Sequence, residues 1–299
     1  MNSILRAGVV GAGVFGGYHA AKWAGFEGVE LSAVLDPNLE RAAALAERHG
    51  ARALKDAADF LAAVDIVSIA SPAVTHAEWV LAAVRAGKPV YVEKPLAVAL
   101  DDAEAIVREA DRRRLVVACG FLERIALSAI GLLGAPEAPV RIEAIRRGAP
   151  SPRNLDVSVV LDLMIHDLDL ALTMGAGEPY AVEAEGGADE ARAEISFDDG
   201  LVATIEASRI AEVPQRRLLV AYPSGEVDID LLAGTLCSTA PFPVEAGFAA
   251  LPEVRDRLGA SIGGFLAAVR GDAPRPVASA LDGLRALDLA LAVEQALGE

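Results

Sequence analysis

Short apolar runs alternate with longer amphipathic stretches over the first 120 residues of the chain. The apolar runs are typical of buried parallel strands and lie at residues 4–10, 30–35, 65–70, 89–92 and 115–119. The amphipathic stretches carry apolar residues three and four positions apart, which is typical of helices, and they lie at residues 39–49, 76–86 and 101–114. This alternation predicts an α/β fold with a doubly wound, Rossmann-type parallel sheet.

Beyond residue 120 the pattern changes, because strand-like segments follow one another directly. Such segments lie at 140–147, 181–185, 191–197, 201–208, 217–222 and 226–230, and a helix is expected at 161–174. Asp198-Asp199-Gly200 and Pro223-Ser224-Gly225 are hairpin signals between strands. Ser279 and Asp282 form a capping box at the start of a last amphipathic helix. We therefore expect a first domain at 1–119 and a second domain at 120–299, the second with a mostly antiparallel open sheet and helices on one face.

Composition narrows the classes of function. The 299 residues carry a formal net charge of −16, which disfavours nucleic acid and anionic membrane as partners. No apolar run approaches the roughly 20 residues that span a bilayer, and no signal peptide is expected. Two cysteines, Cys119 and Cys237, indicate a reducing compartment, so the protein is expected in the cytoplasm. The four histidines lie far apart, so no metal site is expected.

A glycine-rich turn follows the first strand and leads into a helix. In Gly11-Ala12-Gly13-Val14-Phe15-Gly16, the first glycine allows the tight turn, the second lets the backbone approach a phosphate, and the third allows close packing of helix and strand. Asp36 ends the next strand about 20 residues later, the spacing of an acid that binds ribose hydroxyls and repels a 2′-phosphate. The motif predicts NAD as cofactor, with contacts from Asp36 and from Gly11, Gly13, Val14, Phe15 and Gly16. The domain at 1–119 is therefore expected to bind NAD, and the domain at 120–299 is expected to bind substrate and to mediate oligomerisation.

Two further positions carry candidate chemistry. On a regular helix, Asp162, His166, Asp169 and Thr173 form one polar stripe, in which Asp162 can orient the imidazole of His166 as a general base. The alternative is the solvated face of an amphipathic helix. Lys94 follows a strand at the edge where open α/β sheets bind ligands, and its ammonium group can stabilise a developing alkoxide. The alternative for Lys94 is a surface lysine beside a turn.

Four motifs together resemble one family of oxidoreductases. They are the glycine motif, Ser71-Pro72-Ala73-Val74-Thr75-His76, Glu93-Lys94-Pro95, and Asp162 with His166. Their order and spacing are similar to those of the glucose-fructose oxidoreductase / inositol dehydrogenase / rhizopine catabolism family along essentially the whole chain. The resemblance implies His166 as acid/base, Lys94 orienting the substrate hydroxyl, and Asp162 binding substrate and supporting His166. It also implies a cis Lys94–Pro95 bond and cofactor contacts from Ser71, Pro72, His76 and Glu93.

The segments 156–169 and Ala207-Ser208-Arg209 are similar to a narrower bacterial branch that contains UDP-N-acetylglucosamine 3-dehydrogenases. Those enzymes oxidise the 3-hydroxyl so that a partner aminotransferase can make a 2,3-diamino sugar for lipid A. This likeness implies a nucleotide-sugar substrate, with a diphosphate contact from Arg209 and alternatives in Arg124 and Arg153. The segment 120–127 departs from the Gly-His-x-x-Arg-Phe-Asn-Pro pattern of many members, which leaves the substrate open.

Three other readings of the motifs stay open. One is a dehydrogenase of a different sugar or cyclitol, and another is one of the family's NAD-dependent glycosidases, which show no net NADH formation. The third is a sensor that binds NAD and a sugar. By analogy with relatives, a homodimer or homotetramer is expected.

Overall fold

The computed structural model describes residues 4–150 and 156–298 and divides the chain into two compact units. The first unit runs to Phe121 and takes in Leu258–Leu284. The second unit runs from Leu122 to Arg257 and resumes at Arg285. The division after Phe121 lies close to the predicted boundary at 119/120. The expected second domain of 120–299 nevertheless differs from the second unit, because residues 258–284 pack with the first.

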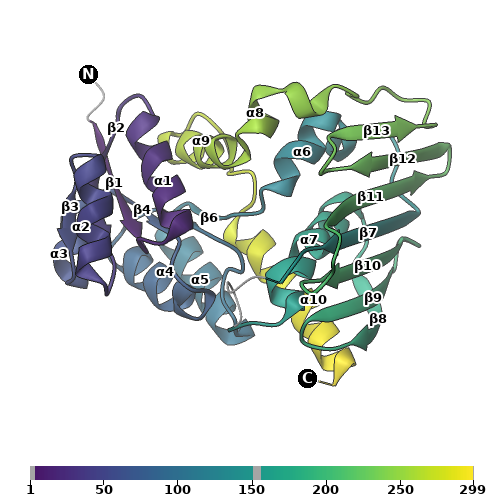
Figure 1. The fold of residues 1–299 in the computed structure, drawn as a ribbon, viewed down its shortest axis with the longest axis horizontal. Helices are drawn as coiled ribbons and strands as arrows, with labels where there is room; N and C mark the ends of the chain where they lie inside the picture. Colours follow the sequence, from purple (N-terminus) through teal and green to yellow (C-terminus); the bar gives the residue numbers. More distant parts are fainter. Residues whose placement is uncertain (1–3, 151–155, 299) are drawn as a thin grey trace. The chain divides into compact units, whose positions relative to one another are not determined.

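A six-stranded parallel sheet forms the centre of the first unit (Figure 1). Its strands are β1 (Leu5–Val10), β2 (Val29–Leu35), β3 (Arg52–Leu54), β4 (Ile66–Ile69), β5 (Val90–Val92) and β6 (Val117–Cys119). They lie in the order β3-β2-β1-β4-β5-β6, with every pair parallel. The order reverses between β1 and β4, which is the switch point where doubly wound sheets bind ligands. The predicted Rossmann-type sheet is confirmed.

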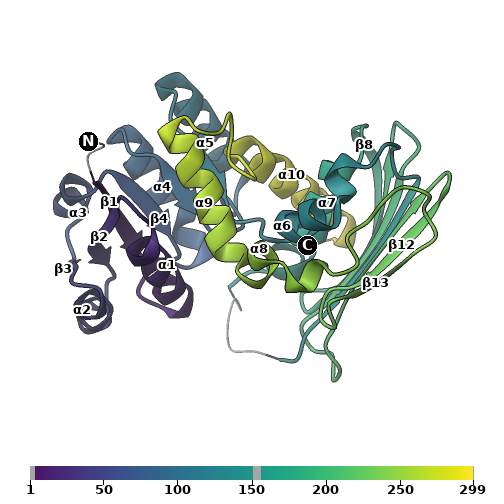
Figure 2. The same ribbon diagram turned by 90° about the horizontal axis from the view of Figure 1, so that it is seen from above.

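Helices cover both faces of this sheet (Figure 2). They are α1 (Val14–Gly25), α2 (Leu39–Arg48), α3 (Ala57–Ala63), α4 (His76–Arg85), α5 (Leu100–Arg113) and α9 (Arg257–Arg270). The core on one face joins α1, α2 and α9, where Trp23 and Phe265 meet edge to face. The Tyr91 hydroxyl of β5 donates to Ser261 of α9 at 2.9 Å. Apolar burial and this hydrogen bond explain why α9 belongs to the first unit although it lies late in the chain.

The second unit is built on a seven-stranded sheet (Figure 1). Its strands are β7 (Arg141–Arg147), β8 (Pro179–Gly186), β9 (Glu190–Phe197), β10 (Val202–Ser208), β11 (Gln215–Tyr222), β12 (Gly225–Asp230) and β13 (Thr235–Ser238). Their order is β13-β12-β11-β7-β10-β9-β8. Only the β7–β10 pair is parallel among these named strands, so the predicted mostly antiparallel sheet is confirmed. Both predicted hairpins are present, one joining β9 to β10 and the other joining β11 to β12.

The helices of the second unit lie on one face of its sheet (Figure 2). They are α6 (Glu123–Ile130), α7 (Ile165–Met174), α8 (Pro252–Arg255) and α10 (Ala280–Leu297), of which α10 begins in the first unit. Alternation along β9 places Ala193, Ile195 and Phe197 in the core, as the period of a strand requires. The capping box of α10 is confirmed, because the Ser279 and Asp282 side chains each accept from the other residue's backbone N–H. No helix within residues 4–150 and 156–298 has the length and apolar content to cross a membrane.

Candidate active site

The glycine turn after β1 has a geometry that only glycine accepts at two positions. Gly11 has a φ of +97°, and an added Cβ would lie 2.7 Å from the Ala70 carbonyl oxygen. At Gly16, an added Cβ would lie 1.8 Å from the Gly11 carbonyl oxygen. Gly11 therefore makes the turn, and Gly16 lets α1 begin against it, as the spacing predicts.

The first turn of α1 fits a phosphate group. Gly13 is the residue before the helix, and a Cβ added there would have nothing within 4 Å. No acidic residue lies in the first turn of α1, and the N-cap residue Gly13 makes no side-chain hydrogen bond to the first N–H groups of the helix. The first N–H groups and the positive end of the helix dipole are therefore offered to an anion. These features fit the pyrophosphate of a dinucleotide.

Asp36 connects the end of β2 to the glycine turn. Its buried carboxylate accepts from the backbone N–H of Ala12 at 2.7 Å and of Asn38 at 2.8 Å. The Arg41 guanidinium lies 3.5 Å away. Because a carboxylate offers about four acceptor positions, Asp36 can still accept from ribose hydroxyls. The position fits the ribose-binding acid that the sequence predicts.

Apolar side chains are exposed beside this turn. Val14 is 57% exposed, Phe15 42% and Tyr18 55%, and the Phe15 and Tyr18 rings meet edge to face at 5.9 Å. All three lie at the start of α1, next to the glycines. Exposed apolar surface at this position suits contact with a bound organic molecule.

His76 connects the two loops that follow β4 and β5. Its Nδ1 lies 2.7 Å from the Pro95 carbonyl oxygen and its Nε2 lies 2.9 Å from the Ser71 carbonyl oxygen. Burial lowers the pKa of His76, and the two carbonyl groups oppose this shift. The histidine fixes Ser71 relative to Pro95, and therefore fixes the turn that carries Lys94. The Lys94–Pro95 bond is cis, as the family resemblance implies.

Glu93 belongs to a second, partly buried polar contact in the first unit. Its carboxylate lies 2.8 Å from Nε2 of His19, whose Nδ1 lies 2.6 Å from the Ser68 hydroxyl. Because a carboxylate only accepts hydrogen bonds, Nε2 carries a proton, and Ser68 can donate to Nδ1. His19 is fully buried on α1 and is a residue that the sequence patterns did not single out. The contact joins α1 to the ends of β4 and β5.

A π-helical turn, Val160–Met164, precedes α7 and carries Asp162. Its hydrogen bonds span one residue more than those of an α-helix, so the regular spacing assumed for the polar stripe is wrong in the first turn. Asp162 is 9% exposed, and His166 lies half-buried on the first turn of α7. Asp169, the third member of the stripe, is 1% exposed, so a solvated helix face is also excluded. π-helical turns are frequent at functional sites.

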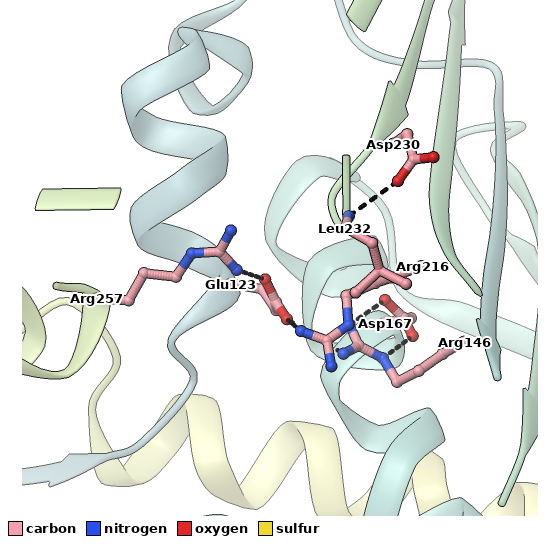
Figure 3. A network of polar contacts seen from close by, with 7 residues as sticks. All are labelled: Glu123, Arg146, Asp167, Arg216, Asp230, Leu232 and Arg257. Carbon is pink, nitrogen blue, oxygen red and sulfur yellow. Dashed lines mark hydrogen bonds and ion pairs between the residues drawn. The ribbon is translucent and has the colours of Figure 1, made fainter. Parts of the chain in front are cut away.

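Two buried arginine–carboxylate pairs hold α7 in place. Arg146 of β7 donates to both oxygens of Asp167 at 2.7 and 2.9 Å (Figure 3). Arg124 of α6 donates to both oxygens of Asp169 at 2.8 and 2.6 Å. These bidentate pairs are strong and directional, and their carboxylates lie one and three residues after His166 on α7. Arg124 thus forms an ion pair within its own unit, whereas the sequence predicts that it contacts the substrate.

Arg209 is also engaged inside the second unit. Its Nε donates to Asp189 at 2.7 Å, and another guanidinium nitrogen donates to the Val157 carbonyl oxygen at 2.7 Å. Arg209 therefore holds the segment that leads into the π-helical turn. Arg153, the other arginine considered for a diphosphate, lies outside the described residues. Among residues 4–150 and 156–298, no group of three or more His, Cys, Asp or Glu side chains could hold a metal ion.

The predicted residues thus form two sets, each inside one unit. Asp36, Lys94 and the glycines belong to the first, and Asp162 and His166 belong to the second. The sequence patterns missed Arg146 and Asp167, and they missed the pairing of Arg124 with Asp169, since the paired residues lie 21 to 45 positions apart along the chain. A buried strand or helix position that carries arginine or aspartate, as in β7 and α7, is the signal that could have found them.

The fold and the glycine turn define an oxidoreductase with an NAD-binding Rossmann fold. The model of the oxidoreductase family with this fold matches residues 5–121. The chain belongs to the glucose-fructose oxidoreductase / inositol dehydrogenase / rhizopine catabolism family, as the motifs predict.

Comparison with individual proteins shows three informative likenesses. The chain is 37% identical to the UDP-N-acetylglucosamine 3-dehydrogenase of Acidithiobacillus ferrooxidans, over 98% of this chain and 97% of that protein. A crystal structure of that enzyme superimposes with a TM-score of 0.91, covering 99% of this chain and 98% of the other. The inositol 2-dehydrogenase of Rubrobacter xylanophilus is 38% identical, over 56% of this chain and 51% of that protein. A protein of gentamicin A biosynthesis crystallised with NAD shares the fold, with a TM-score of 0.84 at 22% identity, covering 100% and 95% of the two chains.

Proposed function

We propose that this protein is an NAD-dependent dehydrogenase that oxidises the 3-hydroxyl of UDP-N-acetylglucosamine. The observation that carries the proposal is the full-length likeness to an enzyme of that activity, at 37% identity over 98% of the chain. The likeness to one inositol 2-dehydrogenase, at 38% identity, covers 56% of the chain, and a myo-inositol 2-dehydrogenase that matches 99% of the chain is only 27% identical. The second unit, which carries Asp162 and His166, therefore supports a nucleotide sugar better than a cyclitol.

The first unit would hold the cofactor. The backbone at Gly11, Gly13 and Gly16 would face the pyrophosphate, and Asp36 would accept from the ribose hydroxyls. Val14, Phe15, Ser71, Pro72, His76 and Glu93 would complete the cofactor site, His76 and Glu93 by fixing the loops and helix around it. Bound NAD supplies the hydride acceptor. Every other part of the chemistry falls to side chains of the protein.

His166 would act as the general base. When a secondary alcohol becomes a ketone, the hydride leaves carbon and the proton leaves oxygen, and the imidazole of His166 would take that proton. Asp162 would orient the ring and stabilise its protonated form. Lys94 would donate a hydrogen bond to the reacting oxygen and stabilise the negative charge that develops there. Contacts of Arg124 and Arg209 with substrate stay predictions, since each holds a carboxylate in the structure.

The ketone product would be the substrate of a partner aminotransferase. Transamination at that carbon gives a 2,3-diamino sugar, which suits lipid A synthesis. Removal of the ketone would also draw an unfavourable oxidation forward. The partner therefore provides a practical means of detecting the dehydrogenase.

A substrate panel tests the proposed function. Purified protein and NAD are mixed with UDP-N-acetylglucosamine, free N-acetylglucosamine or myo-inositol, with and without a 3-aminotransferase and glutamate, and NADH absorbance is followed. We expect NADH with UDP-N-acetylglucosamine, increased by the aminotransferase. NADH formed from myo-inositol alone would favour the cyclitol dehydrogenase, and NAD binding without any NADH would contradict both dehydrogenase proposals.

A further inference from the structure

Two arginines lie directly opposite each other on the helix-covered face of the second sheet. Arg146 of β7 and Arg216 of β11 are Cα partners in the antiparallel ladder, so their side chains share a face. The Arg146 side chain reaches Asp167 of α7, which shows that this is the face toward the helices. Like charges in directly opposite positions repel each other. Negatively charged groups must therefore compensate the positive charge of these two arginines.

Among the described residues, the ion pairs of these two arginines are made with two carboxylates, those of Glu123 and Asp167 (Figure 3). Glu123 of α6 receives three guanidinium groups, from Arg146 at 3.1 Å, Arg216 at 3.4 Å and Arg257 at 2.5 Å. Asp167 is the second carboxylate of the cluster and is bound in a bidentate manner to Arg146. We call these five residues the arginine cluster. Its three guanidinium groups face two carboxylates, which leaves one positive charge in excess.

Arg216 carries the excess charge at an accessible position. Its side chain is 38% exposed, whereas those of Arg146, Glu123 and Asp167 are 4%, 7% and 5% exposed. Its contact with Glu123, at 3.4 Å, is the longest ion pair of the cluster. Burial and the neighbouring Arg146 lower the pKa of Arg216, although Glu123 and Asp167 oppose the shift. The surroundings thus favour the arrival of an additional anion.

The arginine cluster is linked directly to the helix of the proposed base. Asp167, which Arg146 binds, is the neighbour of His166 in the chain, so the cluster and the proposed base share the first turn of α7. Arg216 lies in the second position of β11, at the sheet end where β7 finishes. An anion bound at Arg216 would therefore lie near the helix turn that carries His166.

We propose that Arg216, assisted by Arg257, binds the diphosphate of the nucleotide-sugar substrate. This inference rests on the proposed function and assigns the diphosphate to residues other than Arg209 and Arg124. A planar guanidinium can donate two parallel hydrogen bonds to a phosphate, which makes arginine well suited to this role. The bound diphosphate would neutralise the excess charge of the arginine cluster and would place the sugar toward α7.

Arg217 is a matched control in the adjacent position. It lies on the other face of β11 and donates to Asp228 at 2.7 Å, and its side chain is 39% exposed. Arg216→Gln and Arg217→Gln remove the same charge from neighbouring positions of equal exposure. Arg216→Gln also leaves two guanidinium groups facing two carboxylates, so the fold of the second unit should be retained.

The test combines calorimetry with UDP and steady-state kinetics on the full chain in the presence of NAD. Arg216→Gln should raise the Kd for UDP and the KM for UDP-N-acetylglucosamine about 10-fold or more, with kcat and NAD binding little changed. Arg216→Lys should recover part of the affinity, and Arg217→Gln should match the wild type.

Three outcomes would overturn the inference, and they separate it from the proposed function. If the wild type oxidises UDP-N-acetylglucosamine but Arg216→Gln matches Arg217→Gln, the function stands and the diphosphate assignment fails. If Arg216→Gln raises KM while its UDP affinity is unchanged, Arg216 has a structural role only. If the wild type neither binds UDP nor oxidises its sugar, both proposals fail.

Discussion

The two units arrange their polar groups in different ways. Around the predicted cofactor site of the first unit, contacts with backbone groups are prominent: the glycine turn, the Asp36 carboxylate on two backbone N–H groups, and His76 between two carbonyl oxygens. Around α7 of the second unit, buried ion pairs are prominent, with Arg146 bound to Asp167 and Glu123. The first arrangement suits a cofactor that is recognised through its phosphates and ribose. The second holds α7 in place and, under the proposal above, would leave positive charge for the diphosphate of the substrate.

This difference indicates that the two units have separate roles in cofactor binding and in substrate recognition. The first unit is expected to bind NAD whatever sugar is supplied, since its site is made by one turn and the loops beside it. The second unit is expected to determine the substrate and to move the proton. Apart from Lys94, which belongs to the first unit and is proposed to contact the reacting oxygen, substitutions in the first unit should therefore alter cofactor binding, and substitutions in the second unit should alter substrate binding or turnover.

The largest expected effect concerns the buried ion pairs of the second unit. Arg146→Gln leaves Asp167 and part of the Glu123 charge buried without their main partner, and we expect a loss of about 3–5 kcal/mol in the free energy of unfolding. Arg147→Gln is the matched control, because the neighbouring Arg147 makes an exposed pair with Glu206 at 2.8 Å and should cost at most about 1 kcal/mol. Urea unfolding curves measure both. Equal losses would show that the arginine cluster does not stabilise the second unit.

The next effect separates chemistry from cofactor binding. His166→Ala should lower kcat about 100-fold or more, because the hydroxyl proton loses its acceptor, while the Kd for NAD stays within about twofold. His49→Ala, in the first unit at the end of α2, is the control. Steady-state kinetics and NAD titration provide the two readouts. A loss of NAD binding in His166→Ala would argue against the assignment of cofactor binding to the first unit and proton transfer to the second.

A pair of glycines tests the cofactor turn. In Gly16→Ala the new methyl group would meet the Gly11 carbonyl oxygen, so the turn must shift, at a cost of about 1–3 kcal/mol and with weaker NAD binding. Gly17→Ala lies in the same helix with nothing within 4 Å of the new Cβ, and it should stabilise the protein by about 0.5–1 kcal/mol. Thermal unfolding and NAD titration compare them. Identical behaviour of the two variants would contradict the proposed turn geometry.

The smallest effect is a pH dependence in the first unit. Because burial lowers the pKa of His76 below its ordinary value of 6.5, the unfolded chain binds a proton there more readily than the folded protein. The contribution of neutral His76 to the free energy of unfolding is complete above pH 6.5 and is lost as the pH falls below that value. The free energy of unfolding then falls by at most about 1.4 kcal/mol per pH unit because of this group. The unfolding free energy of His76→Gln should fall less steeply between roughly pH 6.5 and 5 than that of the wild type. Parallel curves would show that His76 is not buried in its neutral form.

The sequence predicts those parts of the fold that depend on interactions between residues close together in the chain. The glycine turn is encoded within six positions, and Asp36 is placed by the strand that ends in front of it. Short elements such as β3, which has three residues, carry too few positions to show a period. The π-helical turn was missed because its apolar spacing is similar to that of an α-helix.

The rest depends on contacts between distant residues. Ile262 and Phe265 of α9 return to the first unit because they fill its core, and no linker sequence marks the return. Glu123 meets Arg257 134 residues later. Arg124 was expected at the substrate from resemblance alone, and its ion pair with Asp169 could not be inferred without the fold.

The most direct test of the central claim follows the hydride from a single carbon. UDP-N-acetylglucosamine carrying deuterium at carbon 3 is incubated with the protein, NAD, the 3-aminotransferase and glutamate, and the reduced cofactor is analysed by mass spectrometry. The account predicts that the deuterium is transferred to the nicotinamide and that oxidation is slower than with the unlabelled sugar. Unlabelled NADH, or no oxidation of this nucleotide sugar, would contradict the account.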